Sequence, residues 1–171
     1  GSPAAAEAIV SYLRSKFHND IRVIVPQISM SAGTMIACAA KVIIMGKQSS
    51  LGPIDPQYNG IPAYNIKAEF EEAKADLAVH PENAQYWAIK LQQYPAAFMK
   101  TALDAIELSS NLITVWLGSC MYNSSIPEEK AIVENIVQQL NEHDRSKTHG
   151  RHFNIDFCRD IGLKIEEMEK D

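Results

Sequence analysis

A run of small residues between two short β-branched segments constrains the fold of this chain most. Residues 28–40 read ISMSAGTMIACAA, and they follow RVIVP at 22–26 and precede KVIIM at 41–45. Short apolar segments rich in valine and isoleucine are typical of buried strands, and small residues let a helix pack closely against a sheet. The pattern therefore predicts a strand, a tight turn, a buried helix and a second strand.

Ser31 stands where the predicted turn becomes the helix. Backbone N–H groups at a helix N-terminus have no partner within the helix, and the helix dipole is positive there. Such groups stabilise the oxyanion that forms when a serine hydroxyl attacks a carbonyl group. A serine is also a common N-cap with a purely structural role. The local pattern leaves two interpretations of Ser31 open, a nucleophile and an N-cap.

Length and charge restrict the class of protein. The 171 residues suffice for one domain, and 46% hydrophobic and 22% charged residues are typical of a globular protein. A net charge of −5, without a basic cluster, argues against nucleic acid as a partner. No apolar run approaches the ~20 residues of a membrane span, and the N-terminus lacks a signal-peptide pattern. We expect a cytoplasmic protein.

The three cysteines, Cys38, Cys120 and Cys158, lie far apart along the chain. An odd number at irregular spacing is typical of buried thiols in a reducing compartment and not of a disulfide framework. Cys38 falls on the apolar helix, where we expect it to serve packing.

Helices and strands alternate at short spacing in the first ~65 residues, whereas residues 66–171 are mainly helical in pattern. The alternation predicts an α/β layer fold with parallel strands, and the nearly continuous apolar run at 21–26 predicts a central strand. We expect the other strands at 42–45, 61–65 and 163–165, and helices at 4–17, 67–80, 85–93, 96–122 and 130–143.

Polar residues in two loops are candidate site residues. Lys47 and Asp55 lie in a loop rich in glycine, proline and asparagine, and we expect turn or surface positions for both. His149 and His152 are three residues apart, but no cysteine or carboxylate cluster accompanies them at ligand spacing. We therefore expect neither a metal ion nor another cofactor.

The sequence resembles the serine dehydrogenase proteinase family. The resemblance is carried by Ser31-Ala32-Gly33-Thr34 after a strand, the alanine-rich helix, VIIM at 42–45 and LGPIDPQ at 51–57. It is specific over about residues 1–67 and continues more loosely to the C-terminus. This family is grouped with signal peptide peptidase A and the ClpP-type proteases. The resemblance implies a single ClpP/crotonase-like domain over residues 1–171, with parallel β-strands and a largely helical C-terminal portion.

The resemblance also implies roles for individual residues. Ser31 would be the nucleophile, and the N–H of Ala32 would supply half of the oxyanion hole. In this clan the other half comes from a Pro-Gly-Gly turn before the first helix, and Gly1 corresponds to the second glycine of that turn. The strands that precede this turn in the clan are missing, so we expect the chain to be a fragment.

The resemblance leaves several candidates for the general base that would accept the proton of Ser31. Related peptidases with this serine motif use a Ser-Lys dyad, and Lys67 corresponds to the lysine of that dyad. Lys74, Lys47 and a histidine remain alternatives. A lysine base has to be neutral, so burial must lower its pKa from about 10.4 towards about 7–8. A lysine at a helix start also opposes the helix dipole, which favours a functional role for Lys67.

The resemblance therefore implies a serine endopeptidase that cleaves extended polypeptide segments through an acyl-enzyme. It also implies a homo-oligomer, with membrane association only through a segment that this chain lacks. Two alternatives remain. One is a catalytically inactive ClpP-like oligomeric scaffold. The other is a crotonase-like enzyme acting on acyl thioesters, although that chemistry needs no nucleophilic serine.

Overall fold

The computed structural model describes residues 2–58, 60–141 and 151–169. The chain divides into two units, of which the first spans residues 1–55 and 108–171 and the second spans residues 56–107. The long helix α5 (Phe98–Trp116) runs from the second unit into the first, and each unit is described by itself below.

A small parallel sheet organises the first unit. Its strands are β1 (Arg22–Val25), β3 (Val42–Met45) and β7 (Ile165–Glu167), in the order β1-β3-β7. Burial alternates along β3, where Ile43 and Met45 are fully buried. Parallel pairing in an α/β fold is thus confirmed.

The position of β1 differs from the sequence prediction. Among the described residues β1 pairs with β3 alone and forms an edge of the sheet, so the prediction of a central strand is wrong for this chain. Val25 is buried, whereas the neighbouring Ile24 is 61% exposed.

A second pair of short strands lies next to the serine motif. Strand β2 (Ile28–Ser29) pairs in parallel with β4 (Ser50–Leu51). Leu51 also forms an antiparallel bridge with Phe153. Residues from three distant parts of the sequence therefore meet around β4.

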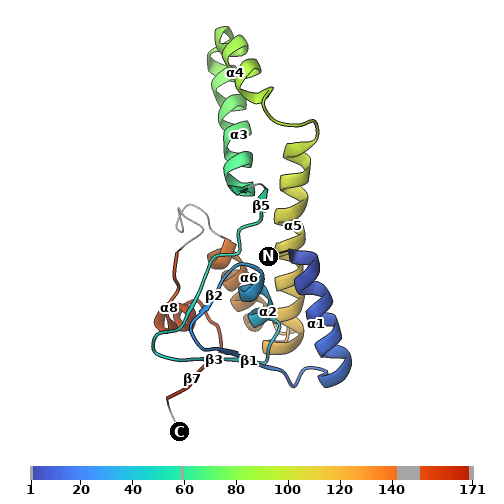
Figure 1. The fold of residues 1–171 in the computed structure, drawn as a ribbon, viewed down its shortest axis with the longest axis vertical. Helices are drawn as coiled ribbons and strands as arrows, with labels where there is room; N and C mark the ends of the chain where they lie inside the picture. The colour runs from blue at the N-terminus through green and yellow to red at the C-terminus, as the bar shows by residue number, and fades with distance from the viewer. Residues whose placement is uncertain (1, 59, 142–150, 170–171) are drawn as a thin grey trace. The chain divides into compact units, whose positions relative to one another are not determined.

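Helices complete the first unit, and Figure 1 shows α2 and α6 close to the small strands. Proline occupies the first turn of α1 and the first position of α6, as expected for a residue without an N–H. The helices are α1 (Pro3–Phe17), α2 (Ala32–Cys38), α6 (Pro127–Asn141) and α8 (Ile155–Asp160). Their apolar faces share one core with the sheet, including Met35, Ile43, Leu117, Ile136 and Leu140.

The predicted helix at 96–122 is shorter and less regular than expected. Helix α5 begins at Phe98, and it passes into a π-helical turn, η2 (Leu117–Met121). The N–H of Tyr122 donates to the carbonyl oxygen of Leu117 at 2.8 Å, which closes this wider turn.

The second unit is a short hairpin followed by packed helices. Strands β5 (Gln57–Tyr58) and β6 (Ile61–Pro62) pair antiparallel, and α3 (Ala63–Val79) follows directly. A 3₁₀ turn, η1 (Pro81–Asn83), leads to α4 (Ala84–Leu91), which lies beside α3 in Figure 1. The predicted helix at 67–80 thus begins earlier, at Ala63.

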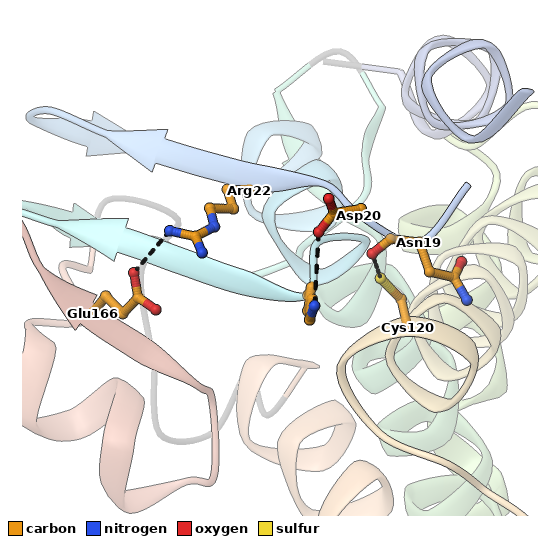
Figure 2. A network of polar contacts seen from close by, with 6 residues as sticks. Asn19, Asp20, Arg22, Cys120 and Glu166 are labelled. Carbon is orange, nitrogen blue, oxygen red and sulfur yellow. Dashed lines mark hydrogen bonds and ion pairs between the residues drawn. The ribbon is translucent and has the colours of Figure 1, made fainter. Parts of the chain in front are cut away.

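Polar contacts near the start of β1 lie on the surface of the first unit (Figure 2). Arg22 on β1 reaches Glu166 on β7 at 3.5 Å, and Lys41 pairs with Asp20 at 3.6 Å. These side chains are more than half exposed, so each pair contributes less than about 1 kcal/mol. The unit is held by its core and not by these pairs.

In the part of the chain that the structure describes, no helix combines the length and the apolar character needed to cross a membrane.

Candidate active site

The turn between β2 and α2 holds Ser31 in an unusual backbone conformation. Ser31 has φ 50° and ψ −111°, and α2 begins at the next residue. A positive φ brings a side chain with a Cβ into steric conflict, so this conformation is costly for serine. The turn is closed by the N–H of Gly33, which donates to Met30 O at 2.9 Å, and by that of Met35, which donates to Ser31 O at 3.0 Å.

The side chain of Ser31 does not cap the helix. Although Ser31 occupies the N-cap position, its Oγ makes no capping hydrogen bond. The side chain is half-buried at the start of α2. The interpretation of Ser31 as a conventional capping serine is therefore wrong, and its strained conformation needs another reason.

The hydroxyl of Thr34 connects this turn to the segment at Gly52 through hydrogen bonds. This buried hydroxyl lies 2.9 Å from the carbonyl oxygens of both Ser29 and Gly52. The N–H of Gly52 donates to Ser29 O at 2.9 Å and lies 3.3 Å from Thr34 Oγ1. These bonds satisfy buried backbone groups on both sides of the turn and fix its geometry.

Small residues allow α2 to sit deep in the first unit. A Cβ at Gly33 would lie 2.5 Å from Ser29 Oγ, so a larger residue there would require the Ser29 side chain to shift. Ala37, Cys38 and Ala40 are fully buried, and α2 packs against α1. Burial raises the pKa of the Cys38 thiol far above its ordinary value. Cys38 therefore serves packing, as predicted.

Ala32 is the first residue of α2, directly after Ser31. The N–H groups of a first helical turn have no acceptor within the helix. The structure thus places the Ala32 N–H at the start of α2, next to Ser31, and its binding of an oxyanion stays a prediction. Gly1, the predicted second donor, lies outside the described residues.

The candidate lysines are all exposed. Lys67 and Lys74 lie on α3 in the second unit, whereas Lys47 lies in a loop of the first unit. Lys47 is a surface residue, as predicted. The structure thus brings Ser31 and Ala32 together in the first unit and places Lys67 in the other unit.

Asp55 departs from the prediction for the loop at 46–60. It is only 3% exposed, so the expectation of a turn or surface position is wrong. The loop enters the core of the first unit here, since the preceding Ile54 is 1% exposed and its N–H donates to Leu140 O at 2.9 Å.

A serine–histidine contact next to β2 was not foreseen from the sequence. The Oγ of Ser50, on β4, is hydrogen-bonded to Nδ1 of His152 at 2.8 Å. The contact depends on the bridge between Leu51 and Phe153, which joins segments about one hundred residues apart, so no local pattern predicts it. His149 lies outside the described residues, and the described residues contain no cluster of potential metal ligands.

Comparison with known proteins finds a family model that matches the N-terminal part. Residues 1–82 match the family model described as ClpP-like SDH-type serine proteinase. The uncharacterized protein MJ0137 of Methanocaldococcus jannaschii is 49% identical over 59 residues, which cover 34% of this chain and 21% of the relative. The uncharacterized protein MJ1495 of the same organism is 50% identical over 44 residues, covering 26% and 15%. The chain thus matches about a fifth or less of these relatives' lengths. No solved structure matches the chain.

Proposed function

We propose, from the premise that residues 1–82 belong to the ClpP-like SDH-type serine proteinases, that this chain carries the nucleophile of a serine peptidase. The family match confirms the resemblance seen in the sequence. The proposal goes further than the match, because it assigns the chemistry to Ser31 and the substrate to the class of extended polypeptides.

The backbone of Ser31 carries the proposal. A non-glycine residue at φ 50° costs about 1–3 kcal/mol and persists only where the surrounding structure holds it. A serine held in this way between a strand and a helix, with its hydroxyl not used as a cap, is the geometry of a nucleophile elbow. This combination supports a chemical role for Ser31 over a structural one.

The proposed reaction begins when a base takes the proton of Ser31 Oγ as the oxygen attacks a peptide carbonyl. The new O–C bond gives a tetrahedral intermediate whose negative oxygen accepts a hydrogen bond from the Ala32 N–H. When the C–N bond breaks, the departing amine takes the proton from the base. Water then hydrolyses the acyl-enzyme with the same base.

We assign the base to Lys67 on the family resemblance. Lys67 is exposed on α3, and a lysine acts as a base only when its amine is neutral. Neutrality at working pH requires that water be excluded. We therefore propose that Lys67 is shielded from water in the active state, either by the bound polypeptide or by a second copy of the chain in a homo-oligomer.

Labelling with a fluorophosphonate probe tests the proposal. We expect the wild-type protein to be labelled and the Ser31→Ala variant to lose labelling. Ser29→Ala is the matched control, since Ser29 is a half-buried serine two residues away, and it should keep labelling. Lys67→Ala should abolish labelling while Lys74→Ala, on the same helix, leaves it intact. Unchanged labelling of Ser31→Ala would refute the proposed nucleophile.

A further inference from the structure

The second unit contains a cavity of about 580 Å³ that the proposed chemistry does not use. Such a volume lies within the range of about 300–1,000 Å³ that is typical of ligand sites. All its lining residues belong to the second unit, from the β5–β6 hairpin, α3, α4, the segment between α4 and α5, and the start of α5. The lining residues include Tyr58, Ile61, Glu69, Lys90, Tyr94 and Phe98.

One wall of the cavity consists of fixed aromatic rings. Tyr94 and Phe98 are stacked, with centroids 5.4 Å apart and planes 16° apart. Tyr58 meets Phe98 edge-on at 5.7 Å. These side chains are half-buried, so they keep part of their surface open to the cavity. A further ring brought by a ligand gains apolar burial and aromatic contact with this wall.

The polar side of the cavity is already neutralised. The Glu69 carboxylate accepts a hydrogen bond from the Tyr94 hydroxyl and pairs with Lys90 Nζ at 2.9 Å. The Lys90 ammonium also lies 4.7 Å from the centre of the Trp87 ring. Because the charges of Glu69 and Lys90 compensate each other, the cavity has little attraction for a strongly charged ligand.

The rim of the cavity offers a neutral hydrogen-bonding group. Gln93 is exposed, and its amide presents a carbonyl oxygen and an NH₂ group. A peptide group has one acceptor, its C=O, and one donor, its N–H. A side-chain amide can form hydrogen bonds with both at once. The cavity therefore combines an aromatic wall, no net charge and a partner for a peptide group.

We propose that this cavity binds an aromatic side chain of an extended polypeptide. The ring packs against Tyr58, Tyr94 and Phe98, and the peptide group beside it is hydrogen-bonded to the Gln93 amide. This inference goes beyond the proposed peptidase chemistry, because the site is complete within the second unit and requires neither Ser31 nor Lys67.

Binding of two blocked peptides tests the inference. Acetyl-Gly-Phe-Gly-amide and acetyl-Gly-Ala-Gly-amide are titrated against the Ser31→Ala protein, and saturation-transfer NMR follows the ligand protons. Using this variant prevents cleavage, so a failure of binding is distinguishable from a failure of the proposed function. We expect the phenylalanine peptide to bind with a dissociation constant on the order of 1 mM, as is usual for a ligand of this size. The alanine peptide should bind at least about tenfold more weakly.

Two matched substitutions localise the binding. Ile61→Trp places a large side chain at the cavity, and we expect it to weaken binding at least about tenfold. Ile89→Trp makes the same change at an exposed isoleucine of α4 outside the cavity and should leave binding unchanged. Gln93→Ala, at an exposed position where folding is not at risk, should weaken binding about threefold.

Three results would overturn the inference. The first is equal binding of the two peptides, and the second is binding that survives both Ile61→Trp and Gln93→Ala. The third is a dimer that Ile61→Trp dissociates while neither peptide binds, which would assign the cavity to a contact between copies of the chain.

Discussion

The hydroxyl of Thr34 joins the Ser31 helix to Gly52, since Thr34 Oγ1 lies 2.9 Å from Gly52 O and 3.3 Å from Gly52 N. This contact connects α2 to the segment after β4, and it lies one helical turn from Ser31. The strained turn is therefore supported from the helix side as well as from the strand side. Support of this kind is what allows a costly backbone conformation to persist.

Replacement of Thr34 by valine tests this support. Valine keeps the shape of the side chain but removes the hydroxyl, which leaves buried backbone groups with fewer partners. We expect the free energy of unfolding to fall by about 1–3 kcal/mol, measured by urea denaturation. Thr114→Val is the control, because that exposed hydroxyl bonds only within α5, to Ser110 O at 2.8 Å. Equal losses in the two variants would contradict a special role for Thr34.

Because the backbone at Ser31 is strained, we expect the protein with glycine at position 31 to be more stable than the protein with alanine there. Glycine adopts positive φ without steric cost, whereas alanine retains the Cβ. We expect Ser31→Gly to exceed Ser31→Ala in free energy of unfolding by about 1 kcal/mol, and both variants to lose labelling.

His18, at the end of α1, provides the comparison for this strain. It has φ 55° and ψ −124°, close to the values of Ser31. His18→Gly should be more stable than His18→Ala by a similar amount while labelling is kept. If glycine and alanine were equally stable at position 31, the backbone of Ser31 would not be strained.

The local pattern around Ser31 was sufficient to predict much of the first unit. Strand Val42–Met45 occurs with the predicted bounds, α1 begins one residue earlier than predicted, and β1 is one residue shorter at each end. These elements could be predicted because apolar runs and proline influence the backbone conformation of residues only a few positions away. The edge position of β1 could not be predicted in this way, because it depends on which distant strands are available for pairing.

Features that depend on distant contacts were missed. The burial of Asp55 and the contact between Ser50 and His152 involve α6 and the bridge at Phe153. The aromatic wall of the second unit needs Tyr58 and Phe98 to meet, although the two residues are on different elements. The backbone conformation of Ser31 could not be predicted from the sequence pattern either, since the same sequence is compatible with an ordinary N-cap serine.

Because Glu69 accepts hydrogen bonds, we expect the stability of the protein to depend on pH in the acidic range. The bond from Tyr94, and then that from Lys90, lower the pKa of Glu69 below its ordinary value. This contribution is present above about pH 4.3, the ordinary pKa of the unfolded state, and is lost as pH falls through the lower folded pKa. We expect Glu69→Gln to lower the thermal midpoint at pH 6 but to matter little at pH 2.5.

Thermal unfolding followed by tryptophan emission measures this difference. Glu71→Gln, an exposed position on the same helix, is the matched control and should have little effect at either pH. A difference between wild type and Glu69→Gln that does not change with pH would show that the carboxylate contributes nothing through its charge.

Burial predicts the order in which the thiols react. Burial raises the pKa of Cys158 to about 12 and that of Cys38 further, whereas Cys120 is half-buried and Arg14 opposes the effect of burial there. Because the thiolate is the reactive form, Cys120 should react first with a disulfide reagent in the folded protein. Cys120→Ser should remove the fast phase, and Cys38 and Cys158 should react only on unfolding. A fast phase that persists in Cys120→Ser would contradict this order.

Mapping the site of the fluorophosphonate adduct tests whether Ser31 is the nucleophile. The labelled protein is digested, and mass spectrometry locates the modified residue. We expect one adduct per chain, on the Oγ of Ser31, and none on the neighbouring Ser29. An adduct at another residue, or no adduct on a folded and assembled protein, would contradict the assignment of Ser31 as the nucleophile.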